Sequence, residues 1–447
     1  MDQGEPGGLR RLGRKRAHLT FRPPVRAVAR AGRHTSHAPP GAERTFMNSV
    51  IPIMPVLSES EQQALFAPVE VADGLPGRVY SNPEYWALER ERLFKEDWFA
   101  IGCASDVPAV GDVMPVGIAG WELVLVRGLD DRVRVFHNIC RHRGTKLVTK
   151  PDNLRMIQCG WHCWTYDLEG RLQRMPILNG PNTSGHDCFE RESLGLVEAR
   201  SGVWHDTVFV NLDGKARSFE AFTASLARLF EPYHLEGYDL THPARHDEVV
   251  LDINWKLYHE GGLEGYHIPF VHPALELPDR YHIDNDPEAF TSLTGSLIKY
   301  KRLGAWVGLP DDTFDMNPAA AAAVSEGRRI PYTICFVTPT VIFAAWPEAI
   351  ITTLLRPISP TRTGVRRNMY FIGDSAISAE AAPARQKYVD IWLGITGEDA
   401  DYSTGVQRLS AQREEIGMQT RFSPYWEEAV KLFQQGVARR AYGASAA

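Results

Sequence analysis

The chain has 447 residues, of which 44% are hydrophobic and 23% are charged, and its formal net charge is −6. A chain of this length is too long to fold around one ordinary hydrophobic core and suits two domains of unequal size. No run of about 20 uninterrupted apolar residues appears, so the sequence predicts no membrane-spanning helix.

Charge is unevenly distributed along the chain. Residues 1–46 carry ten Arg and Lys against three acids, a net charge of +7, so the remaining residues sum to −13. A basic tail can bind nucleic acid or direct a protein to an organelle. Scattered Pro and Gly instead favour disorder, and we expect the protein to start at Met47. We therefore predict no nucleic-acid partner and, without a secretory apolar segment, a cytoplasmic protein.

Two short helices are predicted in the segment 47–95, at Ser58–Leu65 and Asn82–Glu96, the second of them capped by Ser81 or Asn82. From Trp98 onward, short apolar runs alternate with Gly, Asp and Pro, which indicates a small all-β domain over residues 96–215. Its expected strands include Asp112–Val116, Glu122–Arg127, Arg132–Asn138 and Thr207–Asn211.

Residues 216–447 are predicted to form a larger domain of strands followed by helices. We expect a helix at Phe219–Phe230, a strand at Asp247–Trp255, a helix at Leu257–His267 and a strand around Ser296–Lys301. Four further strands are expected at Tyr332–Val337, Thr340–Trp346, Ile350–Pro357 and Gly364–Gly373, and then helices at Ala376–Leu393, Asp399–Ile416 and Tyr425–Ala438. This order favours an α+β fold, with an antiparallel sheet covered on one face by the C-terminal helices.

Two Cys-His pairs in the β region form a first candidate metal site: Cys140 with His142, and Cys159 with His162. Six cysteines in a chain this long do not make a disulfide scaffold. Two thiolates and two imidazoles suit a structural zinc ion, or a [2Fe–2S] cluster with thiolates on one iron and histidines on the other. The cluster is favoured by the residues beside the pairs, which are Arg141, Arg143, Gly144, Gly160, Trp161 and Trp164.

The segment Asn254–Pro273 carries a second candidate site. On a helix, the three-residue step from Glu264 to His267 places both side chains on one face, and Pro269 lets the exit turn bring His272 to the same centre. Two neutral imidazoles with a carboxylate from elsewhere form the facial set that holds iron(II). The alternative is a pair of hydrogen-bonded histidines on a buried helix.

Both segments resemble known motifs. The pattern C-R-H-R-G…C-G-W-H-C-W-T-Y-D-L-E-G is similar to the iron–sulfur motif of the large (α) subunits of Rieske non-haem iron oxygenases, and N-W-K…E-G-Y-H…H is similar to their mononuclear iron motif. The resemblance covers roughly residues 80–440. It implies that Cys140 and Cys159 bind one iron of the [2Fe–2S] cluster, that His142 and His162 bind the other, and that His267 and His272 hold a catalytic iron(II).

The resemblance also implies a third iron ligand in the downstream segment Gly397–Asp401. We choose Asp399, with Asp401 and Glu398 as alternatives. Glu264 matches the family's bridging acid, which contacts a cluster histidine of the neighbouring subunit. The resemblance thus implies a ring-shaped homotrimer, with or without small β subunits, and a helix-grip catalytic domain.

The sequence departs from the family pattern at three positions. Gly261 stands where the family usually has Asn, and Cys163 replaces the small residue after the second cluster histidine. Because four ligands are already present, we expect Cys163 to be a packed free thiol. Glu264 is one methylene longer than the usual Asp, which could alter the route of electron transfer.

The leading hypothesis is a terminal oxygenase that uses O2 to hydroxylate a small organic molecule, by monohydroxylation, dihydroxylation or oxidative dealkylation. No Gly-rich dinucleotide fingerprint follows a predicted strand, so electrons should come from a separate ferredoxin or flavin reductase. Basic side chains near the cluster loops could steer it: Arg141, Arg143, Lys146 and Lys150.

Aromatic side chains could line a pocket for an aromatic or a quaternary ammonium substrate. The candidates are Tyr266, Phe270, Trp306, Phe336, Phe343 and Trp346. The alternative functions are a Rieske-type electron carrier whose second domain binds a ligand, and a zinc-stabilised binding protein.

Overall fold

The computed structural model describes residues 57–272, 275, 281–286, 291–296, 302–306, 308–327 and 332–445. The predicted basic segment 1–46 and all but Ser296 of the strand expected at Ser296–Lys301 lie outside these residues. The described residues belong to one unit, Met54–Ala447.

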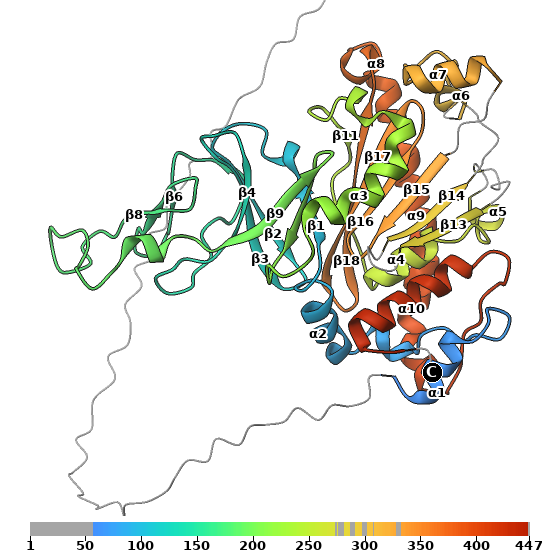
Figure 1. Cartoon of the computed structure of the whole chain (residues 1–447), viewed down its shortest axis with the longest axis horizontal. Helices are drawn as coiled ribbons and strands as arrows, with labels where there is room; N and C mark the ends of the chain where they lie inside the picture. The colour runs from blue at the N-terminus through green and yellow to red at the C-terminus, as the bar shows by residue number, and fades with distance from the viewer. Residues whose placement is uncertain are drawn as a thin grey trace, which may run out of the picture. The chain divides into compact units, whose positions relative to one another are not determined.

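The first sheet is antiparallel, with seven strands in the order β1-β10-β9-β4-β3-β2-β5 (Figure 1). Its strands are β1 Phe99–Cys103, β2 Asp112–Ile118, β3 Trp121–Arg127, β4 Val133–His137, β5 Asp152–Asn153, β9 Glu198–Trp204 and β10 Thr207–Asn211. A smaller sheet contains β6 Ile157–Gln158, β7 Thr165–Tyr166 and β8 Leu172–Arg174. All of these strands lie within the predicted all-β region 96–215.

The second sheet is also antiparallel, in the order β11-β18-β17-β16-β15-β14-β13, and β12 pairs with β18 as well. Its strands are β11 Ala244–Arg245, β12 Val249–Leu251, β13 Tyr281–Asp286, β14 Thr291–Ser296, β15 Tyr332–Val337, β16 Val341–Ala345, β17 Ala349–Ser359 and β18 Arg362–Phe371. All lie within the predicted second region 216–447, whose boundary with the first stays a prediction.

The α-helices are α1 Glu59–Phe66, α2 Pro83–Arg92, α3 Phe219–Phe230, α4 Trp255–Gly262, α5 Ile268–Val271, α6 Leu303–Trp306, α7 Pro318–Ser325, α8 Asp374–Ile377, α9 Ala382–Glu415 and α10 Glu428–Tyr442. None of the helices in the described ranges has the length and apolar character that crossing a membrane requires. Tyr388 and Val389 of α9 share a buried cluster with Ile351, Met369 and Phe371 of the second sheet. Helix α9 therefore packs on this sheet, and the α+β fold with an antiparallel sheet is confirmed.

The strand predicted at Asp247–Trp255 is wrong over most of its length. Strand β12 spans only Val249–Leu251, and Trp255 already begins helix α4. The reason is an N-cap, because Oδ1 of Asn254 accepts a hydrogen bond from the backbone N–H of Lys256 at 3.0 Å.

The helices predicted at Ala376–Leu393 and Asp399–Ile416 are wrong as separate elements. Helix α9 runs without interruption through Gly394 and Gly397. Each internal glycine costs about 1 kcal/mol relative to alanine, a cost that the packing of α9 on the sheet offsets.

A buried ion pair fixes the start of α4, the helix that leads into the second candidate site. Nζ of Lys256 lies 2.5 Å from Oε1 of Glu89 on α2, and both side chains are almost fully buried. The Glu89 carboxylate also accepts from Trp255 Nε1 at 2.8 Å and from the Tyr442 hydroxyl at 2.5 Å. These contacts satisfy the buried carboxylate and join α2, α4 and α10.

Candidate metal centres

Two loops of the first region bring the four predicted cluster residues together. Cys140 and His142 follow β4, and Cys159 and His162 follow β6. Each loop is closed by a backbone hydrogen bond from its cysteine N–H, to Thr145 O in one loop and to Trp164 O in the other, both at 2.8 Å.

The two loops share a second feature, which shows that Cys163 occupies a position suited to glycine. Gly144 and Cys163 each stand four residues after the loop's cysteine, each donates its N–H to that cysteine's carbonyl, and each has positive φ, +73° and +56°. Glycine adopts this conformation without strain, whereas Cys163 pays a backbone cost. Cys163 is exposed, so the expectation that its thiol is packed is wrong.

The donor atoms of the first centre fit a metal cluster. The ring centroids of His142 and His162 lie 4.5 Å apart, and the thiols of Cys140 and Cys159 are both buried. Nδ1 of each histidine is buried without a hydrogen-bond partner among the described residues. Such orphaned nitrogens are costly unless they ligate a metal or bind an ordered water, and two of them beside two buried thiols suit a metal. Burial also lowers the pKa of His142, which keeps the ring neutral and able to ligate.

Groups around the first centre support its ligands. The Tyr166 hydroxyl lies 3.4 Å from Cys140 Sγ and accepts a hydrogen bond from the Arg141 N–H at 3.0 Å. The Trp164 ring stacks on His142 with centroids 4.9 Å apart. Cys140 Sγ therefore has a polar contact, and an aromatic ring covers His142. Both features would affect the reduction potential of a bound cluster.

The second centre lies between α4, α5 and α9. The helix predicted at Leu257–His267 is wrong in its second half, because α4 ends at Gly262 and His267 immediately precedes α5. Glu264 and His267 therefore do not share a helical face. Instead, the Glu264 carboxylate accepts the backbone N–H groups of Tyr266 and His267 and closes the turn between the two helices.

Three donor atoms gather at one point of this centre, within 4.8 Å of one another. Nε2 of His267 lies 3.2 Å from Nε2 of His272, and Asp399 Oδ1 lies 3.0 Å from His272 Nε2 and 3.6 Å from His267 Nε2. Ligands about 2.1 Å from a metal at right angles lie about 3.0 Å apart. The spacing therefore fits a single ion with three protein ligands on one face.

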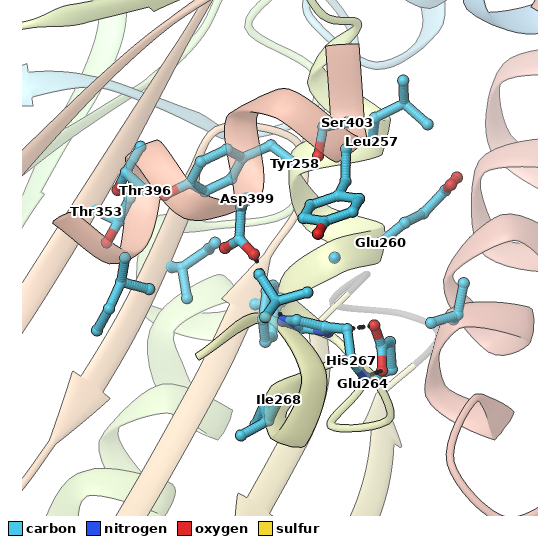
Figure 2. Close-up of a pocket in the computed structure, with 18 of the residues that line it drawn as sticks. Leu257, Tyr258, Glu260, Glu264, His267, Ile268, Thr353, Thr396, Asp399 and Ser403 are labelled. Atoms are coloured by element: carbon cyan, nitrogen blue, oxygen red, sulfur yellow. Dashed lines mark hydrogen bonds and ion pairs between the residues drawn. The ribbon is translucent and has the colours of Figure 1, made fainter. Parts of the chain in front are cut away.

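A carboxylate contacts the far nitrogen of each histidine, and Figure 2 shows the contact between Glu264 and His267. Glu264 Oε1 contacts His267 Nδ1, and Glu398 Oε2 lies 2.7 Å from His272 Nδ1. A proton held on Nδ1 leaves Nε2 as the free donor toward the ion. The role of Glu398 was missed, since the sequence indicated only that an acid of this segment approaches the metal. Asp401, the other alternative ligand, is exposed and outside the gathered set.

The charges of the centre are strongly coupled. Burial lowers the pKa of His267, but the hydrogen bond and charge of Glu264 and the charge of Asp399 outweigh it and raise this pKa overall. Burial raises the pKa of Asp399, a rise that the charges of His272, His267 and Arg367 oppose. An ion with two positive charges would stabilise the carboxylate and the neutral imidazoles together.

The second centre opens into a cavity of about 650 Å³. Its wall includes the three gathered residues and the apolar side chains of Leu251, Leu257, Ile334, Phe336, Ile342 and Trp346. Among the aromatic candidates, Phe336 and Trp346 line the cavity.

The remaining aromatic candidates divide into three cases. Tyr266 and Phe270 are exposed to solvent. Phe343 is buried in a hydrophobic cluster and is not among the residues that line the cavity. The side chain of Trp306 lies outside what the structure describes.

Comparison with known proteins decides the family. Residues 97–185 match the family described as the Rieske [2Fe-2S] domain, and residues 234–443 match the ring hydroxylating alpha subunit (catalytic domain). The chain carries a Rieske domain and a ring-hydroxylating α-subunit catalytic domain. Its two domains are accordingly those that bind a [2Fe–2S] cluster and a mononuclear iron, and the zinc alternative is not supported.

Two curated proteins that are similar to this chain are named as oxygenase subunits. The chain is 32% identical over 202 residues to the glycine betaine monooxygenase oxygenase subunit of Chromohalobacter salexigens, covering 45% of this chain and 43% of the relative. It is 34% identical over 206 residues to the 2-aminobenzenesulfonate 2,3-dioxygenase subunit alpha of Alcaligenes sp, covering 45% and 50%. The match thus spans about half the length of these curated relatives.

A solved structure shares the fold of this chain. The quaternary ammonium Rieske monooxygenase CntA superposes with a TM-score of 0.67 at 20% identity, covering 85% of this chain and 98% of that one. At this identity the likeness concerns the fold.

Proposed function

We propose that this chain is a terminal oxygenase component, which hydroxylates a small organic molecule with O2 and electrons from a separate donor. The observation that carries the proposal is the presence of two donor sets on one chain, one of them beside a cavity of about 650 Å³. An electron carrier needs only the cluster set. A three-ligand centre that opens into a cavity favours an oxygenase.

The ligand assignments are part of this proposal. Cys140 and Cys159 bind one iron of the cluster, and His142 and His162 bind the other through their Nδ1 atoms. The support is that both Nδ1 atoms are buried without a partner among the described residues, and that both thiols are buried. His267, His272 and Asp399 hold the mononuclear iron, supported by the spacing of their donor atoms.

The chain's own residues prepare the site for reaction. The chemistry that the two metals supply is one-electron transfer and O2 activation. Glu264 and Glu398 hold protons on the Nδ1 atoms, which keeps both Nε2 lone pairs directed at one point. The apolar wall contributed by Leu257, Phe336 and Ile342 excludes water from the place where substrate lies.

Partners are proposed from the surface of the first region. Ile139, Met156, Trp161 and Phe189 lie in or near the cluster loops and are exposed. Exposed apolar side chains of this kind mark contact surfaces. We assign this surface to a neighbouring copy in a homotrimer, with or without β subunits, and to a docking ferredoxin or flavin reductase. None of the six cysteines, all of which lie in the described part of the chain, forms a disulfide, which accords with the reducing cytoplasm.

The substrate is proposed as a small molecule. By their names, the two curated relatives act on glycine betaine and on 2-aminobenzenesulfonate. One compound is aliphatic with a quaternary ammonium group and the other is aromatic, yet both carry an acid group. The proposal therefore includes monohydroxylation, dihydroxylation and oxidative dealkylation.

Metal analysis and oxygen uptake test the proposal together. Purified, anaerobically handled full chain should contain about three irons and two labile sulfides. It should consume O2 and form a product heavier by oxygen when a reductase supplies electrons. About two irons per chain, with no product from any substrate in a panel of betaines and aromatic acids, would instead identify an electron carrier.

A further inference from the structure

Arg367 is a buried cation in the wall of the cavity. It lies on β18, and its side chain is only 6% exposed. Nη1 donates to the Trp392 carbonyl at 3.2 Å and to the Thr396 hydroxyl, and Nη2 donates to the Tyr258 hydroxyl at 2.5 Å. All three acceptors are neutral.

No carboxylate of the described residues lies within 4 Å of this guanidinium. The contrast with its neighbour is sharp, because Arg366 on the same strand pairs with Asp106 at 2.6 Å. A buried charge without a counter-ion costs folding free energy. Such a cost is retained where the charge has a ligand to bind.

The Arg367 guanidinium also has N–H donors that no acceptor among the described residues occupies. Arginine has five N–H groups, and the three contacts above leave one on Nε and one on Nη2. These two nitrogens form one edge of the guanidinium fork. That edge matches the two oxygens of a carboxylate or sulfonate.

Its neighbours place this cation close to the second centre. Tyr258 and Thr396, which accept its hydrogen bonds, lie on the side of Asp399 away from Glu264 (Figure 2). Burial raises the pKa of Asp399 and the positive charge of Arg367 opposes this rise by electrostatic interaction, although the two side chains do not form an ion pair. A molecule held by Arg367 would therefore lie beside the gathered donor atoms, within the reach of a small ligand.

We propose that Arg367 binds an acid group of the substrate, and that the substrates of this enzyme are small organic molecules that carry a carboxylate or sulfonate group. This inference rests on the proposed function, because it names the substrate class of the same cavity. It also assigns Arg367 as the residue that orients the substrate. The competing role for Arg367 is an internal counter-charge for Asp399, which needs no ligand.

Calorimetric titration of the iron-loaded, anaerobic full chain tests the proposal with matched probes. Glycine betaine is compared with choline, and benzenesulfonate with methyl phenyl sulfone, which differ mainly in the acid group. We expect an acidic probe to bind about 10- to 100-fold more tightly than its partner. Arg367→Gln should reduce this preference to about threefold or less, and Arg367→Lys should restore part of it. Arg366→Gln, the matched control, should keep it.

Three results would overturn the proposal. The acidic probes bind no more tightly than their partners in the wild type, including the case in which none binds. A second such result is that Arg367→Gln still binds the acidic probes more tightly than their partners. Alternatively, Arg367→Gln loses its mononuclear iron while Arg366→Gln keeps it, which makes Arg367 a support for Asp399. Binding is measured without an electron donor, so failed turnover with a retained acid preference would refute the oxygenase and leave the anion site standing.

Discussion

The two carboxylates that hold the histidines should contribute unequally to iron binding. Glu264 uses both of its oxygens, one for His267 Nδ1 and the other for two backbone N–H groups, and its side chain is 12% exposed. Glu398 makes one contact, to His272 Nδ1, and is 47% exposed. Solvent weakens the second interaction.

Replacement by glutamine separates the two cases. An amide has only one acceptor oxygen, so in Glu264→Gln the NH2 group must face a donor whichever way the amide turns. In Glu398→Gln the amide oxygen can still accept the His272 Nδ1 proton. Loss of a carboxylate behind a metal-bound histidine costs about 10- to 100-fold in metal affinity. We expect Glu264→Gln near the upper limit, about 2.7 kcal/mol, and Glu398→Gln at or below the lower limit, about 1.4 kcal/mol.

The assay is an anaerobic iron(II) titration against a colorimetric chelator. The visible spectrum of the cluster serves as an internal check that the first region remains intact. Asp401→Asn is the matched control, because Asp401 is an exposed acid two residues after Asp399 and should leave affinity unchanged. Equal losses in Glu264→Gln and Glu398→Gln, or no loss in either, would refute the reasoning.

Three further predictions concern the independence of the two centres, the reduction potential of the cluster and the pH dependence of folding stability. His267→Ala should abolish turnover and leave the visible spectrum intact; loss of colour would contradict two independent sites. Tyr166→Phe should lower the reduction potential in voltammetry, because a polar contact to Cys140 Sγ is lost. Burial raises the pKa of Glu260 from its usual 4.5 to about 7, so folding stability falls as pH rises through this window. Glu260→Gln should remove that loss, and its stability relative to the wild type in denaturant titrations should increase from pH 5 to pH 8 by at most roughly 3 kcal/mol.

Elements defined by local signals were predictable from the sequence. Thr207–Asn211, Phe219–Phe230 and Tyr332–Val337 have the predicted bounds. Each is a continuous or periodic apolar segment, and helix α3 begins after a capping Ser218, whose hydroxyl accepts from Ala221 N–H at 3.1 Å. Their boundaries are set within a few residues, which is the range that sequence patterns report.

Elements decided by tertiary packing were not predictable. Gly394 and Gly397 read as a helix boundary, yet α9 passes through both. In contrast, the apolar pattern across Leu257–His267 reads as one helix, yet the chain turns after Gly262. In the second case the Glu264 carboxylate supplies the hydrogen bonds that the turn needs. The spacing that drew attention to the site therefore has a different structural origin from the one predicted.

The adjacent acids Glu398 and Asp399 show how far the sequence can define the site. Consecutive residues of a helix point about 100° apart, so two neighbouring carboxylates cannot reach the same atom from one helix. Here they reach opposite nitrogens of one ring, Asp399 at His272 Nε2 and Glu398 at His272 Nδ1. The sequence predicts that an acid of this segment approaches the metal, whereas the rotation of α9 against the sheet decides which one does. Because α9 runs through this position unbroken, one acid cannot move toward the metal without displacing the other from the ring, and the two roles are fixed together.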